Sequence, residues 1–146
     1  MILAGKPLAT AIRSEVKQRI DDATQRGWAP PTLATILVGA DEESRNFVAL
    51  KAKLARKLGI EVLEADLSAS TSQTALLDQV ERLCADQAVD GILVQLPLPE
   101  GIDAATIQRA IGPAKGVDGL NPENVGRLQS GRGPIDPEED GLLVAP

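Results

Sequence analysis

Histidine and tyrosine are missing from this 146-residue chain, and cysteine, tryptophan and phenylalanine occur once each. The lack of histidine excludes a histidine-based metal site and any Ser/His or Cys/His catalytic pair. The lone Cys84 cannot support a disulfide framework, and it falls among apolar residues at helical spacing, as a core residue would. Because Trp28 and Phe47 are the only aromatic residues, the core must be built from leucine, isoleucine, valine and alanine.

Positive charge is also in short supply, with 15 Lys and Arg against 21 Asp and Glu, for a net charge of −6. Nucleic acids and anionic membrane surfaces are unfavourable partners for such a chain. The sequence contains no apolar run of membrane-spanning length, and its start, MILAGKPLATAIRSE, lacks the apolar stretch of a signal peptide. We therefore expect a cytoplasmic protein that binds neither nucleic acid nor membrane and holds no metal.

The rest of the composition is that of a globular domain, with 43% hydrophobic and 25% charged residues. Short apolar runs alternate with segments of helical spacing. The runs predict strands over residues 32–38, 60–66 and 90–95. The helical spacing predicts helices over residues 8–26, 41–58, 73–87 and about 103–111, the last with Asp103 as N-cap. This alternation predicts an α/β fold, in which βαβ units form a mainly parallel sheet flanked by helices.

The composition changes near residue 120, where glycine, proline, asparagine and acidic residues become frequent. Such a segment is typical of a loop or linker. The chain then ends on Pro146 without a closing helix or strand. We expect that the chain is cut rather than finished at this point.

One face of the helix predicted over residues 41–58 combines apolar and reactive side chains. At 100° per residue, Lys51 falls inside the apolar stripe and Ser44 lies on the same side. The stripe is expected to turn inward, and it consists of Phe47, Val48, Leu50, Leu54, Ala55 and Leu58. Burial disfavours the charged form of a lysine and so readies it for proton transfer. Alternatively, the stem of Lys51 packs while its ammonium group reaches solvent.

The strand predicted over residues 90–95 ends in an uncharged segment, Gln95 followed by Pro97 and Pro99. Ligands of open parallel sheets bind beyond the carboxyl ends of the strands. An amide at that place offers a donor and an acceptor to a neutral heterocycle, with the prolines as a rigid wall. Alternatively, Gln95 only caps free backbone groups and the prolines only end the strand. Asp118, in a glycine-flanked loop, is in the same way either a ligand-binding residue or a turn residue.

The loop after the first strand is a poor phosphate site. The segment Gly39-Ala40-Asp41 lacks the further glycines of a dinucleotide fingerprint and the lysine of a P-loop. Acidic residues at the start of the following helix repel phosphate. We therefore expect no cofactor-binding residues in this chain.

Three segments resemble one family in order and spacing: TILVGADEESRNFVALKAKLARKLGI, VDGILVQLPLPEGID and IGPAKGVDGLNPENVGRL. The family is that of the bifunctional methylenetetrahydrofolate dehydrogenase/methenyltetrahydrofolate cyclohydrolases, and the resemblance covers about residues 1–128. It implies that residues 1–128 form the α/β catalytic domain, with folate in a cleft beside a Rossmann domain that binds NAD(P). It also implies that residues 129–146 are a loop or linker toward that Rossmann domain, which this chain lacks.

The resemblance also implies roles for single residues. Lys51 matches the essential lysine of proton transfer and of activation of the folate one-carbon bridge. Gln95 matches the glutamine that holds this lysine near the reacting centre, and Asp118 matches the aspartate that binds the pterin ring. The remaining substrate-binding positions implied are Ser44, Phe47, Val94, Leu96 and Pro97.

Two departures from the family pattern bear on function. Phe47 stands where the family usually has tyrosine, which keeps stacking but removes a hydroxyl beside Lys51; Gly116 replaces an acidic neighbour of the binding aspartate. The implied activity is oxidation of 5,10-methylenetetrahydrofolate with NAD(P), followed by hydrolysis of the methenyl product to 10-formyltetrahydrofolate. The resemblance further implies a full-length homodimer, and this chain alone is expected to be inactive as a dehydrogenase. The alternative is a non-catalytic folate-binding or regulatory module.

Overall fold

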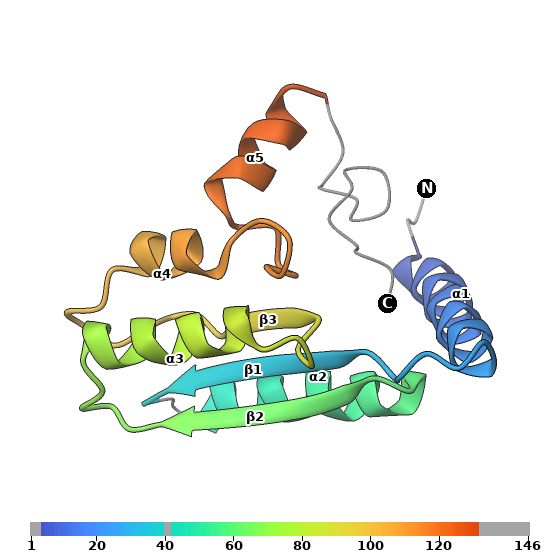
Figure 1. The fold of residues 1–146 in the computed structure, drawn as a ribbon, viewed down its shortest axis with the longest axis horizontal. Coiled ribbons are helices and arrows are strands. Elements are labelled where there is room, and N and C mark those ends of the chain that lie inside the picture. Colours follow the sequence, from blue (N-terminus) through green and yellow to red (C-terminus); the bar gives the residue numbers. More distant parts are fainter. Residues whose placement is uncertain (1–3, 40–41, 132–146) are drawn as a thin grey trace.

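Three parallel strands form one sheet in the order β2–β1–β3 in the computed structural model, which describes residues 4–39 and 42–131 (Figure 1). The strands are β1 (Thr32–Val38), β2 (Glu61–Leu67) and β3 (Gly91–Val94). Leu33 of β1 lies opposite Val62 of β2 on one side and opposite Gly91 of β3 on the other. The predicted α/β fold with a parallel sheet is confirmed, and each strand lies within one residue of its predicted bounds.

Within the described residues, five helices accompany this sheet: α1 (Gly5–Gln25), α2 (Glu42–Leu58), α3 (Gln73–Ala85), α4 (Ala104–Ile111) and α5 (Pro122–Gln129). The first four coincide with predicted helices. The sequence predicted a loop or linker from about residue 120 onward, and this prediction is wrong for the residues that form α5. Asn121 caps this helix by accepting a hydrogen bond from the backbone of Glu123, and Pro122 occupies its first turn. These two start signals outweigh the loop-like composition of the segment.

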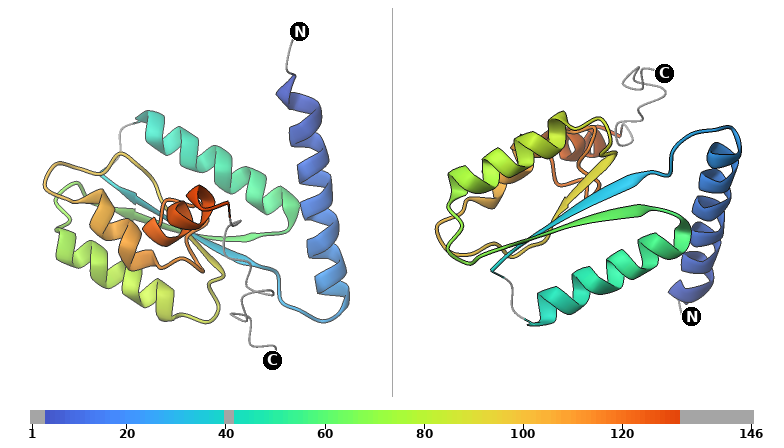
Figure 2. Two further views of the ribbon diagram at one scale, coloured as in Figure 1. Left: turned by 90° about the horizontal axis from the view of Figure 1, so that it is seen from above. Right: turned by 60° about the horizontal axis from the view of Figure 1, so that its bottom comes forward.

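The helices cover both faces of the sheet. Helix α2 lies on one face, α3 and α4 lie together on the other, and α1 lies across the end of the sheet beside α2 (Figure 2). The core fills the space between the sheet and the α3–α4 layer. Its fully buried side chains include Ile36, Leu76, Ile92 and Ile107, each with 0% exposure. The core is therefore built from aliphatic side chains, as the scarcity of aromatic residues predicts.

The buried face of α2 agrees with the predicted stripe at Val48 and Ala55 and differs from it at Phe47 and Leu50. The structure buries Val48, Ala52 and Ala55, whereas Phe47 and Leu50 are 56% and 65% exposed. Small side chains let a helix approach a sheet closely, so the alanines face β1 and β2 and the larger residues turn away. The prediction that the Phe47 and Leu50 side of α2 turns inward is therefore wrong.

Helix α4 begins at the predicted N-cap, Asp103. Its carboxylate accepts hydrogen bonds from the backbone N–H groups of Ala105 and Thr106. The hydroxyl of Thr106 donates to the same carboxylate, which lowers the pKa of Asp103 because the charged form is favoured. This cap sets the start of the helix that carries Gln108.

Gly39, directly after β1, has φ +52° and packs against the backbone of Ala69. A Cβ at position 39 would lie 2.5 Å from the Cα of Ala69. We expect Gly39→Ala to lower the free energy of unfolding by about 2–4 kcal/mol, because positive-φ strain and a backbone clash combine. Denaturant titration measures this change. Gly126→Ala in α5 is the control, since an added Cβ there meets nothing within 4 Å; an equal loss in both variants would contradict the prediction.

Candidate functional site

Lys51 and Gln95 meet at the carboxyl end of the sheet. Gln95 directly follows β3, and its backbone N–H donates to the carbonyl of Ile36 over 2.8 Å. Lys51 reaches it from α2, with 3.0 Å between Nζ and Oε1 of Gln95. The amide nitrogen of Gln95 donates to the carbonyl of Leu96, so its oxygen is directed at the lysine. Both side chains are half-buried.

The ring of Phe47 lies beside this pair, one turn before Lys51 on α2. Nζ of Lys51 is 5.7 Å from the ring centroid, within the range of a cation–π contact. The ring is more than half exposed. It therefore offers a face on which a flat ligand can stack next to the amine.

A cavity of about 420 Å³ opens at this place, lined by Glu43, Ser44, Phe47, Gln95, Leu96 and Pro97. Five of these six residues are predicted site residues, and Lys51 is joined to them through its hydrogen bond with Gln95. Glu43 is the lining residue that the sequence analysis missed as a site residue. Its position four residues before Phe47 puts both on one face of α2, which is the signal that could have found it.

Val94 does not contribute its side chain to this cavity. The residue is 1% exposed and packs within the core. Successive strand residues point to opposite faces, and the last residue of β3 faces the α3–α4 layer. Val94 therefore packs in the core next to Gln95 and does not line the cavity.

Asp118 lies outside the residues that line the cavity. It follows Gly116, which pairs in parallel with Ile92 on the free side of β3. Its Oδ2 accepts a hydrogen bond from Nε2 of Gln108 over 3.2 Å, and its Oδ1 accepts one from the backbone of Leu120 over 3.1 Å. The structure thus places the carboxylate in a turn two residues after this bridge, held at both oxygens.

Gln108 is a second residue that the sequence analysis missed. It is 5% exposed although it is polar, and it lies on the buried side of α4 beside Ile107. The only sequence signal is an amide next to the apolar positions of a short amphipathic helix. That signal is weak, because such an amide can equally face solvent.

Cys84 packs against the core, in agreement with its interpretation as a core residue. Its Sγ donates to the carbonyl of Ile111 over 3.2 Å. Burial raises the pKa of the Cys84 thiol, and the nearby ammonium of Lys115 opposes this shift. The thiol is therefore held in its unreactive form.

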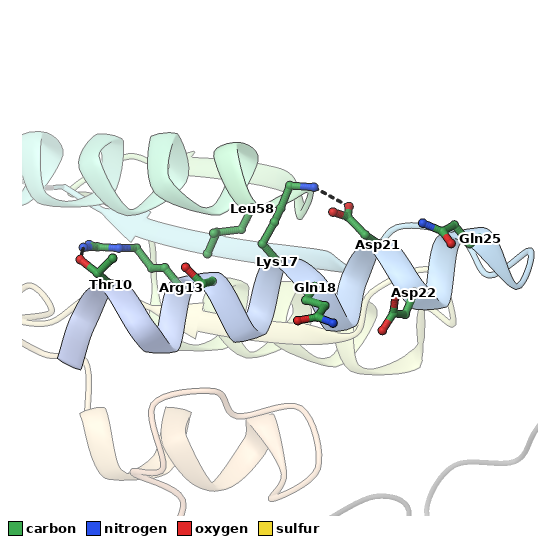
Figure 3. A pocket seen from close by; sticks show the side chains of 9 residues that line it. Thr10, Arg13, Lys17, Gln18, Asp21, Asp22, Gln25 and Leu58 are labelled. Carbon is green, nitrogen blue, oxygen red and sulfur yellow. Dashed lines mark hydrogen bonds and ion pairs between the residues drawn. The ribbon is translucent and has the colours of Figure 1, made fainter. Parts of the chain in front are cut away.

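A larger cavity of about 660 Å³ runs along α1 and reaches Leu58 of α2 (Figure 3). Its charged side chains come from α1, and among them Lys17 forms an ion pair with Asp21. The side chain of Arg13 likewise donates to Thr10. Groups that satisfy their neighbours along one helix do not converge on a ligand, so we place the candidate site at Lys51 and Gln95.

The chemistry of this site is that of an amine and a neutral amide beside an aromatic ring. An amine can transfer protons, and an amide can hold a neutral ring by donating and accepting hydrogen bonds.

Across residues 4–39 and 42–131, no three histidine, cysteine, aspartate or glutamate side chains gather as metal ligands would. In the same part of the chain, no helix is both long and apolar enough to cross a membrane.

Residues 3–118 match the family described as tetrahydrofolate dehydrogenase/cyclohydrolase, catalytic domain. The bifunctional protein FolD of Halothermothrix orenii is 46% identical over 130 residues, which cover 89% of this chain and 46% of that protein. The FolD protein of Aquifex aeolicus is 44% identical over 143 residues, which cover 98% of this chain and 47% of that protein. The chain therefore spans about half the length of the curated relatives it matches.

Solved structures give the same result. The bifunctional FolD dehydrogenase/cyclohydrolase of Campylobacter jejuni superposes with a TM-score of 0.86 at 39% identity, over 90% of this chain and 46% of that one. The FolD dehydrogenase-cyclohydrolase of Trypanosoma brucei, in complex with NADP and an inhibitor, superposes with a TM-score of 0.83 at 35% identity. That match covers 92% of this chain and 46% of the other.

Proposed function

Because this chain belongs to the tetrahydrofolate dehydrogenase/cyclohydrolase family through its catalytic domain, we propose that it binds tetrahydrofolate derivatives and carries the proton-transfer machinery of that enzyme. The proposed activity of the full-length protein is oxidation of 5,10-methylenetetrahydrofolate and hydrolysis of the 5,10-methenyl product to 10-formyltetrahydrofolate. Residues 1–128 would be the catalytic domain and residues 129–146 would lead toward the NAD(P)-binding domain.

The observation that carries the proposal is the hydrogen bond between Lys51 and Gln95 beside the exposed ring of Phe47. In hydrolysis, water adds to the methenyl carbon and one proton of this water is released. The other proton moves to N5 as the bond from that carbon to N5 breaks and the carbon–oxygen double bond of the formyl group forms. The side-chain nitrogen of Lys51 is the group placed to take the released proton, and it donates an N–H to Gln95 whether or not it carries that proton. The amide thereby keeps the amine at one place through both protonation states.

Substrate binding is assigned to the surrounding residues. The ring of Phe47 provides a stacking surface for the pterin, and Ser44, Leu96 and Pro97 form the cavity around it. Asp118 is proposed to accept hydrogen bonds from the donor edge of the pterin ring. A carboxylate held at both oxygens suits this role, because its remaining lone pairs have defined directions.

Among residues 4–39 and 42–131, those around the start of α2 do not fit the phosphates of a nicotinamide cofactor. Gly39 is required for close packing against Ala69 and does not open a phosphate cradle. Glu42 and Glu43 place negative charge in the first turn of α2, where a phosphate would have to bind. We therefore propose that NAD(P) is held by a part of the full-length protein outside this chain. The family resemblance further supports a cytoplasmic homodimer.

Loss of methenyltetrahydrofolate absorbance tests the proposal, with the 146-residue chain and with a version joined to a nicotinamide-binding domain. We expect both to bind folate and to accelerate hydrolysis, with the two-domain version faster because it completes the cleft. Folate binding without turnover in either version would support the non-catalytic binding module instead. Absence of folate binding in both would contradict either function.

A further inference from the structure

We propose that Gln108 is a positioning residue for folate binding, because its side-chain amide holds the carboxylate of Asp118 in one orientation. The inference rests on the proposed function, in which Asp118 binds the pterin ring. It adds a residue on α4 that does not line the cavity at Lys51 and Gln95.

The two oxygens of Asp118 are held from two independent places. Oδ1 accepts from the backbone of Leu120, within its own loop, and Oδ2 accepts from Nε2 of Gln108, across from α4. A carboxylate held only by its own loop can turn about its side-chain bonds. The second hydrogen bond fixes the plane of the carboxylate relative to the sheet. The same helix position also anchors the loop, since the backbone carbonyl of Gln108 accepts from Nδ2 of Asn121 over 3.2 Å.

The carboxylate determines the orientation of the Gln108 amide. Only the NH₂ end of an amide can donate to a carboxylate, and the reversed amide would place oxygen against oxygen. The amide oxygen of Gln108 is consequently buried without a hydrogen-bond partner in the described part of the chain. A buried unpaired acceptor costs stability, and a leucine of similar size would not carry that cost. Stability therefore does not account for glutamine at this position, whereas the hold on Asp118 does.

Calorimetric titration of the chain with 5-formyltetrahydrofolate tests this role, since this folate carries the pterin ring but no hydrolysable methenyl bridge. We expect Gln108→Leu to bind about tenfold more weakly, the size of one lost hydrogen bond to a charged group. Its melting temperature should be equal to or above that of the unaltered chain. Gln108→Glu, which places an acceptor against Asp118, should bind at least as weakly. The matched control is Ile107→Val on the same helix, which should melt lower and bind unchanged.

A double-mutant cycle separates positioning from a general effect on the fold. Asp118→Asn should weaken binding, and adding Gln108→Leu to it should cause little further loss, because Gln108 acts through Asp118. Unchanged binding by Gln108→Leu, or independent losses that add, would overturn the inference while leaving the proposed function intact. If the unaltered chain fails to bind the folate, or if Asp118→Asn binds equally well, the proposed folate site fails and the inference with it.

Discussion

Replacement of Lys51 by alanine is expected to lower the rate of methenyltetrahydrofolate hydrolysis by about 10²–10⁴-fold, the usual contribution of a positioned acid–base group. The amine is the group proposed to accept the proton, and the structure places it against Gln95; alanine leaves only the ring and the amide. Single-turnover and steady-state rates, followed by loss of methenyl absorbance, should show the loss in kcat.

The matched control is Lys53→Ala, an exposed lysine of the same helix. It changes the net charge equally but removes no contact at the site, so its rate should stay close to that of the unaltered chain. Folate binding by Lys51→Ala should weaken far less than the rate falls, because Phe47 and the cavity wall remain. A rate within about threefold of the unaltered chain would remove Lys51 from the mechanism.

Replacement of Gln95 by leucine is expected to lower the same rate by about 10–100-fold. The change removes the acceptor that holds Nζ of Lys51 and the donor to the carbonyl of Leu96. An amine that samples several positions spends less time in line with the reacting carbon, so kcat should fall more than substrate affinity. The measurement is kcat and KM for methenyltetrahydrofolate, in the two-domain version and in the chain itself.

Two comparisons make the Gln95 result specific. Gln18→Leu, on the exposed side of α1, introduces the same side-chain change away from the site and should leave kcat unchanged. The double variant with Lys51→Ala should be no slower than Lys51→Ala alone, since Gln95 is proposed to act through the lysine. A purely additive loss would show that Gln95 acts independently of Lys51.

Sequence patterns predicted the sheet well because buried parallel strands leave a strong local signal. The run TLATILV is β1 residue for residue, and the run before Gln95 is β3. The lack of charge after β3 pointed to a ligand-binding edge, and three segments of the sequence were enough to indicate the family. These inferences depend only on which residues stand next to one another along the chain, and the sequence gives that information without a structure.

Other features depended on which surfaces fit together. The helical spacing of α2 predicted that Phe47 and Leu50 point inward. In the structure Ala52 and Ala55 pack against the strands instead, and Phe47 and Leu50 are exposed. The end of the chain looked like a linker by composition, yet a cap and a first-turn proline started α5.

The sequence by itself determined the fold class and the family, because both are recorded in local patterns, and it predicted which residues are reactive. The family resemblance implied that Gln95 holds Lys51, and the structure supplies the geometry of that contact. Only the tertiary structure decided that Val94 faces the core and that Gln108 holds Asp118. The physical reason is distance along the chain. Such contacts join separate elements, and their geometry depends on strand order, helix rotation and close packing, which no local pattern encodes.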